Sequence, residues 1–269
     1  MANRDSAFSG SIPEIYDRCL GPMLFEPYAA DLAQRAAALG PKRILETAAG
    51  TGIVTAALAA ALPEAEIVAT DLNPGMLSVA ADRVASDRIR FQPADAQTLP
   101  FGDDAFDLVV CQFGVMFFPD RVGAYREARR VLKPGGAFLF NTWSSLDQNR
   151  LPQLVDQAVA ALFPGDPPGF VGRTPHGYHD QARIAEDLAV AGFYDVAIDK
   201  LALPSCASSA RQPAVGFAHG SPLRMEIEAR DESRLDEAAE MAAKAVEIEF
   251  GTGPIEAVMT ANVVLARAP

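Results

Sequence analysis

The chain has 269 residues, with 35 acidic against 23 basic side chains and a formal net charge of −12. This balance argues against a surface for nucleic acid or anionic membrane, because phosphate binding depends on clustered Lys and Arg. Apolar residues make up 49% of the chain, enough for a sizeable core in one large domain or two small ones. No apolar run approaches the ~20 residues that span a bilayer, so no membrane span is expected.

The cysteines indicate a reduced compartment. Cys19, Cys111 and Cys206 are an odd number without metal-ligand spacing, which favours a cytoplasmic protein. The first residues lack the apolar stretch of a signal peptide, so no leader is expected. Cys111 lies in an apolar strand pattern and is expected to be buried and inert.

In chain order, residues 1–24 are rich in turn formers, and an amphipathic helix is expected from Phe25 to Leu39, ended by Gly40 and Pro41. Strand and helix patterns then alternate. Such alternation predicts a parallel sheet that is covered by helices on both faces. The strands are predicted near residues 43–47, 66–70, 88–92, 106–111 and 136–142, and the helices near 53–62, 74–85 and 120–131.

After Trp143 the pattern is looser. A helix is predicted near 151–162, a Pro/Gly-rich loop at 163–179, a helix capped by Asp180, and a strand near 194–201. No linker marks a boundary, so residues 1–269 are expected to form a single domain. Its expected parts are an N-terminal arm and helix (1–40), a cofactor-binding core (41–145), a loop, helix and sixth strand (146–206), a helical cap insertion (207–250) and a final strand (251–269).

The most informative segment is residues 43–52, where an apolar strand leads into Glu46 and a turn with Ala48, Gly50 and Gly52. Small residues let a ligand approach the backbone, and the helix that follows offers free N–H groups. Asp71 ends the next strand 71 − 52 = 19 residues after Gly52, close to the roughly 20-residue spacing of a ribose-binding acid. The leading acid suits a cationic amino-acid group and would repel a pyrophosphate.

Four motifs follow one another over residues 43–143. They are Glu46-x-Ala-x-Gly-x-Gly, Asp71-Leu-Asn-Pro-Gly-Met-Leu, Pro93-Ala-Asp-Ala-Gln-Thr-Leu-Pro-Phe, and Phe106-Asp-Leu-Val-Val leading to Arg130-Val-Leu-Lys-Pro-Gly-Gly. In these motifs the chain resembles class I S-adenosylmethionine-dependent methyltransferases, in the small-molecule branch that includes the ubiquinone and menaquinone biosynthesis enzymes. It departs from the family at Ala48, where the first motif has glycine, which slightly tightens the cofactor pocket.

The resemblance implies a Rossmann-like, seven-stranded, mostly parallel α/β sheet with helices on both faces and a helical cap insertion. The last strand would lie antiparallel between the fifth and the sixth. The implied cofactor is S-adenosyl-L-methionine. The residues implied in its binding are Glu46 and Ala48 with Gly50 and Gly52 at the amino-acid end, Asp71 at the ribose, Leu72 and Met76 beside the adenine, Asp95 and Ala96 at the adenine edge, and Cys111, Gln112 and Phe113 after the fourth strand.

Each of these residues also has a plainer interpretation. Glu46 can be an acid beside a helix start, Gly50 and Gly52 turn glycines, Asp71 a helix N-cap, and Asp95 a loop acid. Asp107, inside the fourth strand, is expected to tether loops rather than to bind a ligand.

The methyl acceptor is expected beyond the carboxyl ends of the strands, where open α/β sheets bind ligands. The loop after the fourth strand would supply apolar walls. The expected acceptor-pocket residues are Tyr16, Phe25, Tyr28, Met116, Phe117 and Phe170, all of which can instead be core packing.

No metal is expected, because His176 and His179 lack a third ligand. Tyr178 and His179 are weak candidates for an acid or base, and otherwise belong to a surface loop. The motifs do not require a catalytic base.

These features predict methyl transfer from S-adenosylmethionine to a small-molecule acceptor by in-line displacement, with neither nucleic acid nor membrane as partner. One alternative is a nicotinamide-dependent oxidoreductase, which shares the βαβ start and Asp71 but needs a third fingerprint glycine and a hydride-transfer set. The other is a non-catalytic adenosylmethionine-binding protein. The sequence carries no signal for the oligomeric state or for the identity of the acceptor.

Overall fold

The computed structural model describes residues 5, 8 and 10–269. Its centre is a seven-stranded sheet with the order β3-β2-β1-β4-β5-β7-β6. Neighbouring strands from β3 to β5 run parallel, whereas β7 runs antiparallel to β5. The strands are β1 (Arg43–Thr47), β2 (Glu66–Asp71), β3 (Ile89–Pro93), β4 (Phe106–Gln112), β5 (Leu132–Trp143), β6 (Asp195–Ala207) and β7 (Ile255–Arg267). This order confirms the Rossmann-like fold and the antiparallel last strand between the fifth and the sixth.

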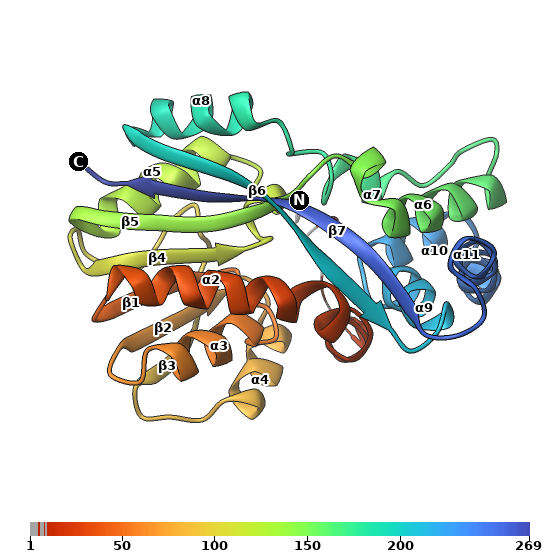
Figure 1. Cartoon of the computed structure of the whole chain (residues 1–269), viewed down its shortest axis with the longest axis horizontal. Coiled ribbons are helices and arrows are strands. Elements are labelled where there is room, and N and C mark those ends of the chain that lie inside the picture. The colour runs from red at the N-terminus through yellow and green to blue at the C-terminus, as the bar shows by residue number, and fades with distance from the viewer. Residues whose placement is uncertain (1–4, 6–7, 9) are drawn as a thin grey trace. The chain divides into compact units, whose positions relative to one another are not determined.

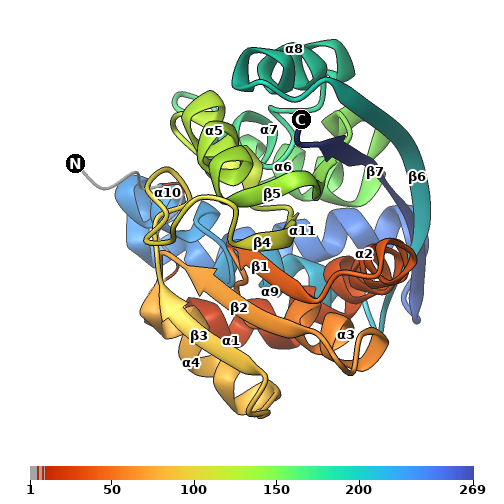
Figure 2. The same cartoon turned by 90° about the vertical axis from the view of Figure 1, so that its left-hand side faces the viewer.

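Helices cover both faces of the sheet. Figure 2 shows α2 (Glu26–Leu39) and α3 (Ile53–Ala61) on one face, and α5 (Arg121–Val131) and α8 (Gln181–Ala191) on the other. Another helix, α4 (Pro74–Arg83), contacts β2 and β3. Strands covered on both faces need continuous apolar runs, and the interiors of β1 and β4 are accordingly buried.

The chain divides into two compact units. The sheet unit comprises Tyr28–Trp143, Tyr178–Leu201 and Ala261–Pro269, and the helical unit comprises the described residues up to Pro27 together with Ser144–Gly177 and Ala202–Thr260. The expectation of a single domain with a cap at 207–250 stays a prediction. None of the helices in the described part of the chain combines the length and apolar character that crossing a membrane requires.

The helical unit contains helices that the sequence predicted, near 151–162 and within 207–250, and a helical run at residues 12–25 that it did not (Figure 1). Its helices are α1 (Ile12–Ile15), the π-helix η2 (Tyr16–Phe25), α6 (Arg150–Leu162), α7 (Phe170–Arg173), α9 (Arg211–His219), α10 (Leu223–Asp231) and α11 (Leu235–Phe250). Short 3₁₀ turns occur at η3 (Val115–Phe117) and η4 (Leu146–Gln148), and at η5 (Glu232–Arg234).

The expectation that residues 1–24 form a turn-rich arm is wrong for residues 12–24, and residues 1–4, 6, 7 and 9 lie outside the described part. Pro22 lies inside η2, where the Glu26 N–H reaches back to the Gly21 carbonyl. The wider π-helical turn accommodates a residue that cannot donate a hydrogen bond. Gly216 of α9 packs directly against Leu20, so this helix is stabilised by tertiary contacts.

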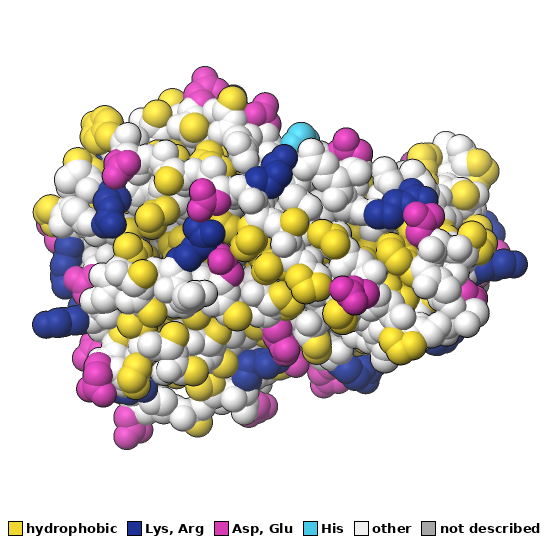
Figure 3. Space-filling view, viewed as in Figure 1, with side chains coloured by type: hydrophobic (Ala, Val, Ile, Leu, Met, Phe, Trp, Pro, Cys, Tyr) yellow, Lys and Arg dark blue, Asp and Glu magenta, His cyan; other side chains and the backbone are white. Residues whose placement is uncertain are grey.

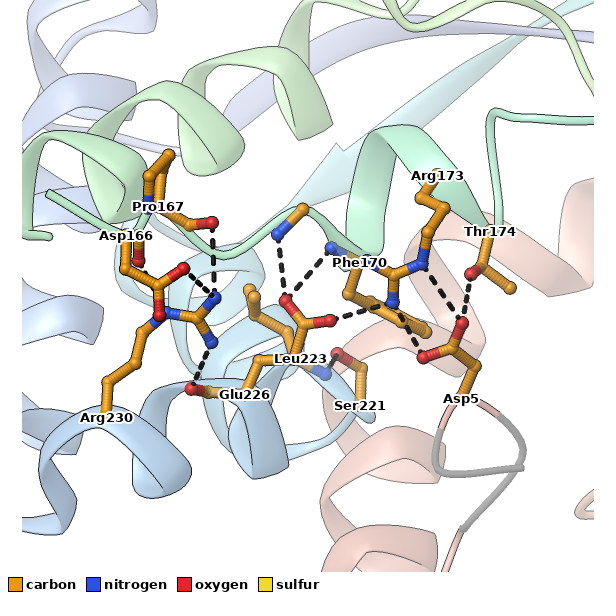
Figure 4. A network of polar contacts seen from close by, with 11 residues as sticks. Asp5, Asp166, Pro167, Phe170, Arg173, Thr174, Ser221, Leu223, Glu226 and Arg230 are labelled. Carbon is orange, nitrogen blue, oxygen red and sulfur yellow. Dashed lines mark hydrogen bonds and ion pairs between the residues drawn. The ribbon is translucent and has the colours of Figure 1, made fainter. Parts of the chain in front are cut away.

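A polar network in the helical unit fixes the short helix α7 (Figure 4). The Glu226 carboxylate accepts hydrogen bonds from the Phe170 N–H at 3.3 Å and the Arg173 guanidinium at 2.7 Å. Arg230 donates both to the carbonyl oxygen of Asp166 at 2.5 Å and to its carboxylate at 3.2 Å. The Pro/Gly-rich segment is therefore tied to α10 by side chains whose charges are already paired.

Asn149 makes several buried hydrogen bonds in the helical unit. Its Oδ1 accepts from the Thr260 N–H at 2.7 Å, while its Nδ2 donates to the carbonyls of Ser144 at 3.3 Å and Ser145 at 3.1 Å. The side chain is completely buried.

Replacing Asn149 by alanine should lower the thermal midpoint and the urea midpoint, because the buried Thr260 N–H loses its acceptor at a cost of about 1–3 kcal/mol. The control is Gln157→Ala, an exposed position on α6. Equal unfolding midpoints for the two variants would contradict this role for Asn149.

Candidate cofactor site

The turn between β1 and α3 alternates left-handed residues, with φ of 52° at Ala48, 56° at Gly50 and 77° at Gly52. Gly50 and Gly52 are glycine for different structural reasons. A Cβ at Gly52 would lie 2.8 Å from the Ala80 Cβ of α4, so glycine there permits helix packing. A Cβ at Gly50 would meet no atom within 4 Å, so the space beside this part of the turn is open.

The turn packs against the loop that follows β4. A Cβ at Gly114 would lie 2.5 Å from the Ala48 Cβ and 2.7 Å from the Cys111 Sγ, so only glycine fits there. Cys111 is completely buried, and burial raises the pKa of its thiol to about 12. The thiol is therefore inert at neutral pH, and a cofactor contact by Cys111 would have to use its backbone.

Glu46 lies near the carboxyl end of β1 with only 1% of its surface exposed. Its Oε2 accepts a hydrogen bond of 2.6 Å from the Thr55 hydroxyl of α3. Burial, with a further contribution from the charge of Asp71, raises the pKa of Glu46 to about 8 despite the Thr55 hydrogen bond. A nearby cationic group would favour the ionised form.

Asp71, at the end of β2, joins two backbone segments. Its Oδ2 accepts from the Gly50 N–H at 2.9 Å and its Oδ1 from the Asn73 N–H at 2.8 Å. Asn73 holds the N-cap position of α4, so the plainer interpretation of Asp71 as that cap is wrong. Burial raises the pKa of Asp71, although these backbone hydrogen bonds oppose the shift. Oδ1 also accepts from the Asn73 Nδ2 at 3.4 Å, whereas Oδ2 still has a lone pair for a hydroxyl donor.

The residues expected beside the adenine differ in exposure. Leu72 is 57% exposed, whereas Met76, in the first turn of α4, is buried. Asp95 is exposed, and its Oδ1 accepts from the Gln97 N–H at 2.9 Å, which closes a local turn next to the half-buried Ala96. An apolar side chain left exposed beside Asp71 suits a stacking partner. The adenine roles of these residues stay predictions.

The loop after β4 contributes a buried aromatic cluster within the sheet unit. Phe113 stacks on Trp143 with ring centroids 3.7 Å apart, and Tyr28 meets both rings edge-on at 5.2 Å. Phe113 has a φ of 51°, and its N–H donates to the Asn141 Oδ1 at 2.9 Å. The Met116 sulfur accepts from the Trp143 N–H at 3.4 Å.

The other members of the expected acceptor pocket fall in both units. Met116 is buried and Phe117 is half-buried in the sheet unit. In the helical unit Tyr16 stacks on Phe25 with centroids 4.8 Å apart, and Phe170 is buried. That these residues close over one acceptor stays a prediction, as does the contact of the half-buried Gln112 with the cofactor.

Tyr178 is poorly suited to proton transfer. Its hydroxyl donates to Asp187 at 2.8 Å and lies 3.3 Å from the Tyr125 hydroxyl, and burial raises its pKa. His179 is exposed, whereas His176 is buried with its Nδ1 2.8 Å from the Ser144 carbonyl. Within the residues that the structure describes, no three His, Cys, Asp or Glu side chains gather as a metal centre would need.

Three residues that the sequence analysis missed support this site. Thr55 binds the buried Glu46, Trp143 stacks on Phe113, and Asn141 holds the Phe113 backbone. The signal for Trp143 was its position as the only tryptophan, at the end of the fifth strand. Nothing in the local sequence distinguishes Thr55 or Asn141.

Comparison with known proteins assigns this part of the chain to a class. Residues 45–140 match the family described as methyltransferase domain. The match covers 140 − 44 = 96 of the 269 residues and agrees with the class that the motifs predicted.

Individual relatives agree with this class. A demethylmenaquinone methyltransferase of Clavibacter sepedonicus is 35% identical over 165 residues, which cover 58% of this chain and 66% of the relative. An uncharacterized protein of Mycobacterium tuberculosis is 42% identical over 112 residues, 40% of each chain. The match thus spans 40% and 66% of the lengths of these two relatives.

Solved structures share the fold beyond this segment. A phosphoethanolamine N-methyltransferase of Haemonchus contortus, solved with phosphomonomethylethanolamine and S-adenosylhomocysteine, superposes with a TM-score of 0.61. The alignment covers 96% of this chain and 57% of the other at 18% identity, so the likeness concerns the fold alone.

The stability of the protein should depend on the ionisation of Glu46. Its pKa in the folded state, about 8, lies above the ordinary 4.5, so its stabilisation is complete below pH 4.5 and is lost as the pH rises toward 8. Relative to Glu46→Gln, the parent should lose up to about 1.4 kcal/mol of unfolding free energy per pH unit in this window.

Urea unfolding between pH 5 and pH 8 measures this difference. The control is Glu64→Gln, an exposed acid in the connection before β2. A difference between the parent and Glu46→Gln that does not change with pH would show that Glu46 is not buried in its neutral form.

Proposed function

We propose that the protein is an S-adenosylmethionine-dependent methyltransferase that acts on a small-molecule acceptor. The observation that carries the proposal is the arrangement around Gly50. Open space lies beside a left-handed turn, and the Gly50 amide is held by Asp71. The buried Glu46 lies near the carboxyl end of the adjoining strand.

The residues of this site fit the cofactor. A cationic amino-acid end beside Glu46 would offset the cost of its burial, since an opposite charge favours the ionised carboxylate. Asp71 retains a lone pair on Oδ2 for a ribose hydroxyl, and Leu72 offers an exposed apolar face for a base. When bound, the cofactor supplies a methyl group on a sulfonium, which is an excellent leaving group.

The residues of this chain must then position the acceptor and exclude water. Holding the reacting atoms near contact distance can supply about 7–11 kcal/mol of the barrier. Phe113, Trp143 and Tyr28 form a dry, close-packed aromatic wall suited to this task. The proposal includes no catalytic base and no metal, and it places the enzyme in the cytoplasm.

The acceptor that we propose is largely apolar or aromatic. The similarity to a demethylmenaquinone methyltransferase supports a quinone-like or phenolic ring, and the aromatic residues after β4 and β5 suit such a ring. The net charge of −12 opposes a nucleic-acid acceptor.

Calorimetric titration with S-adenosylmethionine and with NAD tests the cofactor. The parent should bind S-adenosylmethionine in preference to NAD. Gly50→Val should abolish this binding, because the β-branched side chain fills the open space. Gly135→Val is the matched control, since Gly135 also has a positive φ, 74°, and equally open surroundings but lies among the first residues of β5. It carries the same backbone strain and should bind normally.

Retained affinity in Gly50→Val would remove the turn from the cofactor site, and preferential binding of NAD would favour an oxidoreductase. Binding of S-adenosylmethionine without turnover on a broad panel of phenols, quinones and amines would favour a non-catalytic protein.

Phe113→Ala should reduce kcat or raise the KM for the acceptor at least about tenfold, because the loss of a close-packed aromatic contact loosens acceptor alignment. The Kd for S-adenosylmethionine should change much less. Steady-state kinetics on the best acceptor of the panel, with calorimetry for the cofactor, measure both quantities. Unchanged acceptor kinetics, or preferential methylation of tRNA or DNA, would contradict the proposed pocket.

A further inference from the structure

The sheet unit has a second concave site that the proposed reaction does not use. A pocket of about 450 Å³ lies among the α2–β1 connection, the start of β4, the first residues of β5 and the end of β7. These are the amino ends of β1 and β4, whereas Glu46 and Gln112 lie toward the carboxyl ends of the same strands. The pocket is therefore distinct from the candidate cofactor site.

The charged groups lining this pocket are Lys42, Lys133, Arg267 and Asp107. We call it the basic pocket. Figure 3 shows Lys and Arg side chains projecting at the left-hand end of the sheet unit, where Figure 1 draws the C-terminus. Three cations against one carboxylate make a locally positive site on a chain whose net charge is −12.

The one lining carboxylate, Asp107, is already fully engaged. Its Oδ2 accepts from the backbone N–H groups of Lys42 at 3.0 Å and Arg43 at 2.8 Å, and its Oδ1 from the Lys133 ammonium at 2.7 Å. This confirms the expected tethering role of Asp107. It also means that Asp107 cannot neutralise the remaining cations.

Two cationic groups therefore stay uncommitted. Within the described residues the Lys42 ammonium has no hydrogen-bond or ion-pair partner, and the Arg267 guanidinium has only the Gly135 carbonyl at 3.4 Å. Gly135 is left-handed, and a Cβ there would meet nothing within 4 Å, so the turn leaves the pocket open beside it.

We propose that the basic pocket binds a small phosphate-bearing ligand. Two free cations suit a dianion better than a single carboxylate, and a guanidinium offers several N–H donors to phosphate oxygens. The pocket volume exceeds that of a phosphate group, and the apolar lining residues Leu39, Pro41 and Pro134 offer a surface to an attached organic group.

Titration of the full-length protein with inorganic phosphate at low ionic strength tests this site. The parent should show saturable binding that weakens with added salt. Lys42→Gln and Arg267→Gln should each raise the Kd at least about fivefold, and the double variant should abolish binding. Lys244→Gln removes the same charge from an exposed position on α11 and should leave the Kd unchanged. Each variant changes an exposed side chain, so folding should be retained, which a thermal melt checks.

Two further measurements distinguish the basic pocket from the cofactor site, and free phosphate from a phosphate ester. Saturating S-adenosylhomocysteine should not displace phosphate from the basic pocket. A sugar phosphate that binds more tightly than inorganic phosphate would identify a phosphate ester as the ligand, and equal affinity would identify free phosphate.

Three results would overturn the proposal. They are absence of saturable binding up to about 10 mM phosphate, unchanged binding in the double variant, and displacement by S-adenosylhomocysteine. None of them bears on the cofactor site, which is tested through Gly50.

Discussion

The cofactor edge of the sheet depends on a carboxylate held out of water at Glu46. An apolar residue would fill this position of β1 without any electrostatic cost, whereas the buried acid has a pKa of about 8 and one hydroxyl donor, Thr55. An ionised carboxylate in such a place is expensive unless a positive charge lies beside it. A cationic ligand group beside Glu46 would remove this cost and let the carboxylate ionise, as the proposed function requires.

Backbone strain occurs at the same site, in the turn after β1 and in the loop after β4. Ala48 and Phe113 both adopt positive φ although neither is glycine, and Gly114 brings their two loops into contact. Each such residue costs about 1–3 kcal/mol and persists only where its surroundings enforce it. Here the enforcing contacts are the Asn141 acceptor and the Trp143 ring. The strain therefore fixes the walls of the site in advance, which lowers the cost of ordering them around a ligand.

Local patterns sufficed for the parts of the fold whose signals are local. The final strand was predicted within residues 251–269 and found at Ile255–Arg267, because an alternating apolar run there follows a Gly-rich turn. Pro22 indicated a break where a π-helix continues, and the contact that sustains it comes from Gly216, far along the chain. Thr55 and Asn141 could not be predicted for the same reason, since their roles depend on contacts with residues distant in the sequence. Glu46 and Asp71, in contrast, are identified by their spacing from the glycines.

Asp71 and Asp107 have the same side chain, but their surroundings suit one to ligand binding and the other to a structural role. Both carboxylates accept backbone N–H groups from a neighbouring connection. Asp71 is buried without a cation, and burial raises its pKa despite those hydrogen bonds. For Asp107 burial acts in the same direction, but hydrogen bonds from Lys133 and the backbone outweigh it and lower the pKa. A carboxylate already neutralised by a lysine gains little from a ligand, whereas a buried one without a cation gains much. This difference supports the proposed binding role of Asp71 and the structural role of Asp107, although their backbone hydrogen bonds alone would not distinguish them.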